Sequence, residues 1–276
     1  MDGVTGPFVL SRFRVVVIHA ILPAMPLITL LTDFGTADPY VAEMRGVLYS
    51  QTPGATLADL SHGIAPGDVR AAAYLLGRAW HRFPPGTVHL VVVDPAVGTG
   101  RAALVFGAGG HWFTGPDNGV FTPVLDLVDP PLVAMAAPDG AAPTFHGRDL
   151  FAPAAAALAR GTLPAALGEP IPTVPVRLVL PAPFYEGKTV TGEVISVDRF
   201  GNLVTNLTPA EVPSYATLEV EATDIGPLRR TFSDVEAGQL VAYVGSGGQV
   251  EIAVRDGSAA RRIGLGVGGR VRARLG

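Results

Sequence analysis

The chain has 276 residues, a formal net charge of −4 and no cysteine. Hydrophobic residues make up 48% of it and charged residues 16%, which is enough apolar side chain for a sizeable core and excludes wholesale disorder. The lack of cysteine rules out disulfides, thiolate catalysis and cysteine zinc sites and agrees with a cytoplasmic location, while the lack of a basic run argues against nucleic-acid binding.

Residues 1–26 are interpreted as an extension outside the folded core. Two arginines precede their apolar stretches, as in an export signal. His19 and Pro23 interrupt those stretches, which are too short to cross a bilayer, so we expect no membrane association. We favour Met25 as the natural start and keep a cleaved export signal as the alternative.

Strand and helix patterns alternate over residues 27–168, which predicts an α/β domain with a mixed or parallel sheet. In chain order we expect a strand ending at Thr32, a helix opened by Asp38 and Pro39, a strand over 56–60, a helix over 67–82, strands over 88–93, 102–106 and 111–114, and a helix over 149–160.

Prolines are frequent over residues 169–188, which we interpret as a linker. Beyond it, residues 189–276 carry strand patterns separated by Gly and Asp turns, with no strong helical period. This predicts an all-β, barrel-like second domain. The expected strands cover 189–197, 203–206, 216–222, 240–244, 250–254 and 270–275.

Two acids follow apolar runs that are typical of buried strands. Asp33 ends one run, and Asp94 ends a second run of three valines and is followed by a glycine-rich turn to Arg101. Because ligands bind at the carboxyl ends of strands in open sheets, we expect both acids to face one polar crevice. For Asp94 taken alone, capping of the next turn is an equal alternative.

His146 precedes the predicted helix over 149–160, of which Asp149 is the expected N-cap. A lone histidine is more often structural than catalytic, but His146 lies in the same half of the chain as Asp94 and Arg101 and is able to handle a proton. The histidines show no metal-ligand spacing, so we expect no metal and no cofactor.

Three loops of the chain were considered for function, and only the first has both an ordinary and a functional interpretation. The stretch from Asp198 to Asn202 is an ordinary hairpin turn by composition, yet its Asp and Asn flank an aromatic residue and could hold an amino-acid zwitterion. The glycine-rich stretch 245–248 lies between strands and lacks the lysine of a phosphate-binding loop. The 115–119 stretch is explained as a turn.

Six motifs in order resemble the S-adenosyl-L-methionine (SAM) hydroxide adenosyltransferases, relatives of the SAM-dependent fluorinating and chlorinating enzymes. The likeness runs from about Leu27 to the C-terminus. The motifs are Thr32-Asp33-Phe34-Gly35, Val93-Asp94-Pro95-Ala96-Val97-Gly98-Thr99, Gly115-Pro116-Asp117-Asn118-Gly119, Thr144-Phe145-His146-Gly147-Arg148-Asp149, Phe200-Gly201-Asn202 and Glu251-Ile252-Ala253-Val254. The chain departs from the family pattern at Gly245 and Gly247, where relatives often have larger side chains.

The resemblance implies a hydrolase that converts SAM to adenosine and L-methionine by in-line attack of water or hydroxide on the ribose C5′. It implies a homotrimer that binds SAM between the first domain of one subunit and the second domain of the next. The hydroxide-using members carry an Asp–Arg–His set, which corresponds here to Asp94, Arg101 and His146. Whether Asp94 or His146 accepts the proton stays open.

The resemblance also implies which residues bind each part of the substrate. The expected binding residues are Asp33 on the ribose hydroxyls, Asp198, Asn202 and Ser246 on the methionine end, Phe200 packed on the ligand, and Val254 and Asp256 near the adenine.

Three alternatives are weighed against hydrolysis. The complete Asp–Arg–His set argues against a SAM-dependent halogenase, which lacks it, and against a non-catalytic protein that binds SAM or adenosine. A hydrolase with a metal held by Asp33, Asp94 and Asp117 is the alternative outside the resemblance.

Overall fold

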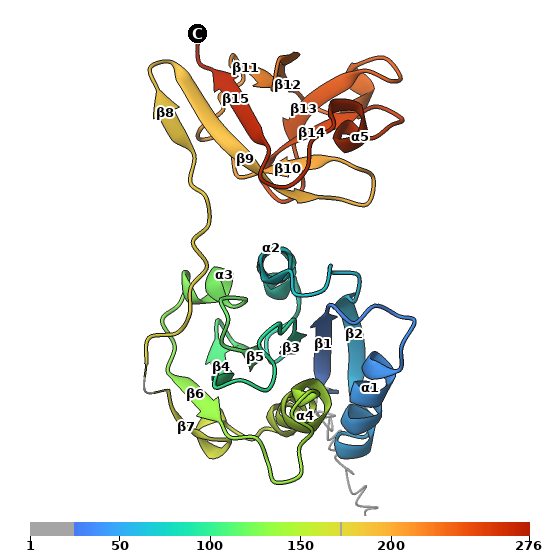
Figure 1. The fold of residues 1–276 in the computed structure, drawn as a ribbon, viewed down its shortest axis with the longest axis vertical. Helices are drawn as coiled ribbons and strands as arrows, with labels where there is room; N and C mark the ends of the chain where they lie inside the picture. Colours follow the sequence, from blue (N-terminus) through green and yellow to red (C-terminus); the bar gives the residue numbers. More distant parts are fainter. Residues whose placement is uncertain (1–24, 172) are drawn as a thin grey trace, which may run out of the picture.

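The computed structural model describes residues 25–171 and 173–276, which form two units joined by an extended segment (Figure 1). The expected extension over 1–26 therefore lies almost wholly outside the described residues. Within them, no helix combines the length and the apolar character needed to cross a membrane.

The first unit is built on a seven-stranded mixed sheet in the order β2-β1-β3-β5-β4-β6-β7. The first four of these strands run parallel to one another, and the pairs β5–β4, β4–β6 and β6–β7 are antiparallel. The strands are β1 (Leu27–Thr32), β2 (Thr56–Ser61), β3 (Val88–Val92), β4 (Ala103–Ala108), β5 (His111–Pro116), β6 (Leu132–Met135) and β7 (Glu169–Pro170).

Helices cover both faces of this sheet because neighbouring strand residues point to opposite sides. Leu30 packs with one pair of helices and Leu31 packs with the other. The first pair is α1 (Tyr40–Gln51) and α4 (Ala152–Ala159), and the second is α2 (Val69–Ala79) and α3 (Thr122–Leu125). Short 3₁₀ turns follow at Trp80–Arg82 and Pro164–Ala166.

The second unit is a closed barrel of seven strands in the order β10-β14-β13-β12-β11-β15-β9, because β10 pairs with both β14 and β9. The strands are β8 (Phe184–Glu186), which pairs outside the ring with β9 (Thr189–Val197), then β10 (Leu203–Thr205), β11 (Thr217–Val220), β12 (Thr223–Arg229), β13 (Leu240–Val244), β14 (Val250–Val254) and β15 (Arg270–Arg274). A 3₁₀ turn at Phe232–Asp234 and helix α5 (Ala259–Ile263) complete it.

The predicted fold class is met only in its coarser form, as two β-rich units with a mixed sheet first and a barrel second. The first unit departs from a regular α/β pattern because β4 and β5 form an antiparallel hairpin with no crossover helix, and β6 and β7 extend it antiparallel. The second unit contains α5, which the sequence pattern did not predict; Ser258 caps it by accepting a hydrogen bond from the Arg261 amide.

Candidate active site

Strand β3 delivers Asp94 to the carboxyl edge of the first sheet. The chain turns immediately after it, with the Val97 amide donating to the Asp94 carbonyl and the Thr99 amide donating to the Ala96 carbonyl. Gly98 has a φ of +78°, and a Cβ there would lie 2.9 Å from the Pro143 carbonyl oxygen. The turn therefore requires glycine at this position, and it returns the chain so that Arg101 faces Asp94.

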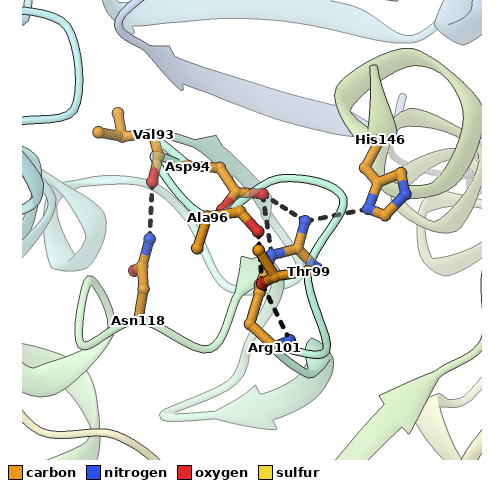
Figure 2. A network of polar contacts seen from close by, with 7 residues as sticks. All are labelled: Val93, Asp94, Ala96, Thr99, Arg101, Asn118 and His146. Atoms are coloured by element: carbon orange, nitrogen blue, oxygen red, sulfur yellow. Dashed lines mark hydrogen bonds and ion pairs between the residues drawn. The ribbon is translucent and has the colours of Figure 1, made fainter. Parts of the chain in front are cut away.

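Asp94, Arg101 and His146 form one connected group (Figure 2). The Arg101 Nε donates to Asp94 Oδ2 at 2.9 Å, and the Arg101 Nη2 contacts the same oxygen. The same Nη2 lies 3.0 Å from His146 Nδ1. Both members of the ion pair are nearly buried, and the Arg101 guanidinium lies over the Phe151 ring. The three predicted residues are thus brought together by one guanidinium.

This geometry defines the tautomer of His146. A guanidinium only donates hydrogen bonds, so Nδ1 must be the acceptor and the proton of the neutral ring is on Nε2. Burial lowers the pKa of His146, and the Arg101 guanidinium lowers it further, against the opposing effect of the Asp94 and Asp149 carboxylates. His146 is therefore a neutral imidazole at neutral pH, with Nε2–H as its available donor.

Asp94 has one oxygen in use and one that is unengaged. Oδ2 takes both contacts from Arg101, whereas Oδ1 is buried and has no hydrogen-bond partner among the described residues. Leaving a buried carboxylate oxygen without a partner costs free energy unless water or a ligand supplies the hydrogen bond. Oδ1 is therefore a place where a bound water would be held.

The backbone next to this group is braced from the 115–119 turn. Asn118 Nδ2 donates to the Val93 carbonyl at 2.8 Å (Figure 2), and the Val120 amide donates to Asn118 Oδ1. The turn interpretation of 115–119 is wrong for Gly115 and Pro116, which end strand β5 and pair with β4, and it holds for 117–119. The Asn118 contacts hold the end of the strand that precedes Asp94.

The predicted cap role of Asp149 is wrong. His146 itself occupies the N-terminal boundary of a π-helical turn over Gly147–Phe151, and Asp149 lies inside that turn. Its carboxylate accepts from the Ala142 amide at 2.9 Å and from the Arg148 guanidinium. The wide π turn, a local form that is frequent at functional sites, precedes α4.

Asp33 and Asp94 line one pocket, as the strand-end pattern predicted. The pairing of Thr32 with Val92 in the parallel β1–β3 ladder brings the two strand ends side by side. The pocket has a volume of about 270 Å³ and is also lined by His146. Asp33 Oδ2 accepts a hydrogen bond from the Gly67 amide at 2.7 Å.

An aromatic cluster forms part of the wall of this pocket. Phe34, Tyr40 and Phe145 all line it, with ring centroids 5.3–5.8 Å apart in tilted and edge-on arrangements. Tyr40 is 44% exposed, so the cluster opens to the surface. No ligand-binding role was predicted for these three rings from the sequence. Phe34 and Phe145 lie within the quoted motifs next to Asp33 and His146, and that adjacency was the available signal.

The predicted residues of the second unit do not line this pocket. Asp198 shapes its own turn, with Oδ1 accepting from the Phe200 and Asn202 amides and Oδ2 accepting from Asn202 Nδ2. Phe200 is 74% exposed, Val254 is buried, and Asp256 is exposed with a φ of +59°. Within one chain these residues and the Asp94 pocket are separate.

Ser246 does not line the Asp94 pocket either; it lines a larger cavity of about 690 Å³ between the two units. Its Oγ accepts a hydrogen bond from Arg78 Nη2 of α2 at 2.9 Å. Arg78 was not predictable from the sequence, because a lone arginine on a helix gives no indication of a contact with a residue 168 positions away.

The three carboxylates of the metal alternative do not assemble. Asp94 is paired with Arg101, and Asp117 accepts from the Val176 amide at 2.9 Å, away from the Asp94 pocket. Burial raises the pKa of Asp117. Over residues 25–171 and 173–276, no three His, Asp or Glu side chains come together as a metal site requires.

The mixed sheet, the barrel and the Asp–Arg–His pocket define a two-domain protein with a candidate hydrolytic site. Residues 28–168 match the SAM hydroxide adenosyltransferase N-terminal domain and residues 192–272 match the C-terminal domain of that family. The chain therefore belongs to the SAM hydroxide adenosyltransferase family.

Relatives in sequence and structure agree with this assignment. The chain is 46% identical to an (R)-S-adenosyl-L-methionine hydrolase of Thermus thermophilus, over 88% of this chain and 97% of the relative, and 39% identical to one of Salinispora tropica, over 91% and 98%. A fluorinase of Actinoplanes is 29% identical, over 83% and 90%. The crystal structure of an uncharacterized conserved protein from Thermotoga maritima, 33% identical, superposes with a TM-score of 0.83 over 90% of this chain and 99% of that one.

Proposed function

We propose that this protein hydrolyses SAM to adenosine and L-methionine. The observation that carries the proposal is the buried Asp94–Arg101–His146 group on a pocket that Asp33 also lines, in a chain whose similar relatives are named (R)-SAM hydrolases. The fluorinase relative is more distant in sequence, which favours hydrolysis over halogenation.

The chemistry requires help for the nucleophile and little for the leaving group. The water oxygen forms a bond to C5′ while the C5′–S bond breaks, and the sulfur keeps the electron pair and departs as the neutral thioether of methionine. No general acid is needed. Water is a weak nucleophile at neutral pH, so the site must hold it in line and accept its proton.

The hydrogen bonding of the site favours Asp94 as the proton acceptor. His146 Nδ1 is engaged by Arg101 and its Nε2 carries a proton, whereas Asp94 Oδ1 has no partner among the described residues. In this proposal Asp94 Oδ1 takes the water proton. Arg101 stabilises the developing hydroxide, and His146 Nε2–H orients the water.

Binding of the ribose hydroxyls by Asp33 would align C5′ with this water. Its Oδ2 is oriented by the Gly67 amide, and the remaining acceptor positions are available for the two hydroxyls. Asp198, Asn202 and Ser246 would hold the methionine end, with Phe200, Val254 and Asp256 against the rest of the ligand.

We further propose that each site is shared between subunits of a cytoplasmic homotrimer. The Asp94 pocket, at about 270 Å³, is below the range typical of a whole small-molecule site. Its lining residues all come from the first unit, whereas Phe200 of the second unit is exposed and lines no part of it. A head-to-tail ring would join the two half-sites.

Product analysis tests the function. Purified protein is incubated with the (R) and (S) sulfonium epimers of SAM separately, with and without added chloride or fluoride and with a chelator, and products are identified by mass spectrometry. We expect adenosine and methionine from the (R) epimer, unaffected by halide or chelator. Formation of a 5′-halo-5′-deoxyadenosine, or no turnover of either epimer, would contradict the proposal.

A further inference from the structure

Arg78 crosses from the first unit to the second. It lies on α2, yet its Nη2 donates to Ser246 Oγ at 2.9 Å and its Nη1 donates to the Tyr74 hydroxyl at 3.0 Å. Among the described residues these two contacts use two of its five N–H donors. Three donors are left to meet a ligand.

The glycine-rich loop is shaped around this guanidinium. A Cβ on Gly247 would lie 2.5 Å from Gln249 Oε1, 3.0 Å from Arg78 Cζ and 3.1 Å from Arg78 Nε, so a side chain at 247 would displace both Gln249 and Arg78. At Gly245 the same space is filled by the Glu251 carboxylate, whose other oxygen accepts from the Tyr243 hydroxyl at 2.8 Å. The lack of side chains at Gly245 and Gly247 thus leaves room beside Ser246 for the Arg78 guanidinium of α2 and the Glu251 carboxylate of β14.

Arg78 lies among both acidic and basic side chains. The hydrogen bond to Tyr74 raises the pKa of Arg78, and the Glu251 and Asp198 carboxylates raise it further, so both acids lie within electrostatic reach. The 690 Å³ cavity next to it is lined by Arg70 and Arg82 as well, with Glu193 as the carboxylate among its lining residues. Three arginines and one carboxylate among the lining residues favour an anionic group of the ligand, such as a carboxylate, at Arg78.

We propose that Arg78, together with Ser246, binds the α-carboxylate of the methionine part of the substrate. This inference rests on the proposed function, and it assigns Arg78 to the half-site formed by the second unit of its own chain, although α2 belongs to the first. A guanidinium recognises a carboxylate through paired N–H donors, which lysine does not reproduce.

An interdomain clamp is the competing explanation, because the Arg78–Ser246 bond also joins the two units. The two explanations differ in one respect. A clamp affects every substrate equally, whereas a carboxylate site affects only ligands that carry the carboxylate. The decarboxylated analogue of SAM keeps the sulfonium and the ammonium but lacks the carboxylate, so it distinguishes the two explanations.

The experiment compares Arg78→Ala and Arg78→Lys with wild type on SAM and on the decarboxylated analogue. For Arg78→Ala we expect the KM for SAM to rise about ten- to hundredfold, as for loss of a charge-assisted hydrogen bond, with kcat nearly unchanged and the KM for the analogue unchanged. Arg78→Lys should recover part of the loss. Arg160→Ala removes an arginine of the first unit that lies outside the cavity and donates to the Gln51 carbonyl; it is the matched control and should leave both KM values unchanged.

Equal losses on both substrates, or no loss on SAM, would overturn the inference. Calorimetric binding of L-methionine and of 3-(methylthio)propylamine supplies a readout that needs no turnover. If wild type does not turn over SAM but binds methionine through Arg78, the proposed function fails and this inference stands. If methionine binding is absent from wild type or survives Arg78→Ala unchanged, the inference fails.

Discussion

His146 Nδ1 accepts a hydrogen bond from Arg101 Nη2 across 3.0 Å, so the imidazole and the Asp94 carboxylate share one guanidinium. The consequence is a division of roles within the group. Arg101 occupies the acceptor nitrogen of His146 and one oxygen of Asp94, which leaves Asp94 Oδ1 as the free acceptor and His146 Nε2–H as the free donor.

The first prediction concerns the titration of His146. Burial and Arg101 disfavour its charged form, so its pKa lies below the ordinary value of 6.5 and the ring stays neutral at pH 7. NMR titration of the His146 ring protons should give a midpoint below 6.5 in wild type. Replacing Arg101 with Ala removes one of the two causes and should raise that midpoint. A wild-type midpoint at or above 6.5 would contradict the geometry.

The second prediction concerns the group on the nucleophile. Asp94→Ala, Arg101→Ala and His146→Ala should each lower kcat about a hundredfold or more, with SAM binding largely retained, because these side chains act on the water. Steady-state kinetics and calorimetric SAM binding measure the two effects. Ser50→Ala is the control: its hydroxyl donates to the Val47 carbonyl on α1, and Ser50 does not line the Asp94 pocket. Wild-type turnover in all three variants would contradict the roles proposed for Asp94, Arg101 and His146.

The third prediction concerns stability against acid. His89 is fully buried between Thr29 and His111, and burial lowers its pKa to about 3. The unfolded chain, with the ordinary value of 6.5, therefore binds more protons between pH 3 and 6.5. The stability that the neutral ring contributes is full above pH 6.5 and is lost as the pH falls, by up to about 1.4 kcal/mol per pH unit.

Urea unfolding of wild type and His89→Phe at pH 7, 6 and 5 measures this effect. The free energy of unfolding should fall more steeply with acid in wild type than in the variant, because phenylalanine has no proton to bind. Parallel pH dependences in the two proteins would show that His89 is not the source.

The fourth prediction concerns the shared site. Asp94→Ala and Asn202→Ala chains, each inactive alone, should regain activity when mixed under conditions of subunit exchange. In a head-to-tail ring assembled at random from equal amounts, about a quarter of the sites would draw both halves from unaltered sequence. Persistent inactivity, with exchange demonstrated by labelled subunits and folding checked by thermal melting, would indicate sites within single chains.

Several features of the fold followed from local pattern, and the rest depended on distant contacts. The valine run before Asp94 predicted β3 because β-branched residues suit a buried strand. β12 was missed because Gly226 and Pro227 interrupt its pattern, and α5 was missed because five residues carry too little period. β8 was not predicted because it lies in the proline-rich segment, and it is formed by antiparallel pairing with β9.

The site divides in the same way. The convergence of Asp33, Asp94 and His146 could be predicted because these residues lie at strand or helix ends, and the glycine-rich turn after Asp94 indicated Arg101. Arg78 and the proton position on His146 were not accessible, since the first depends on how α2 meets the 245–248 loop and the second depends on a single interatomic contact.

Hydrolysis in oxygen-18 water tests most directly the proposal that water held at Asp94 Oδ1 attacks the ribose C5′, because the new C5′–O bond then carries the oxygen of that water. Mass spectrometry of the products should find one oxygen-18 atom in adenosine, at the 5′-hydroxyl, and none in methionine. Adenosine without the label, or label carried by methionine, would contradict attack of water at the ribose carbon.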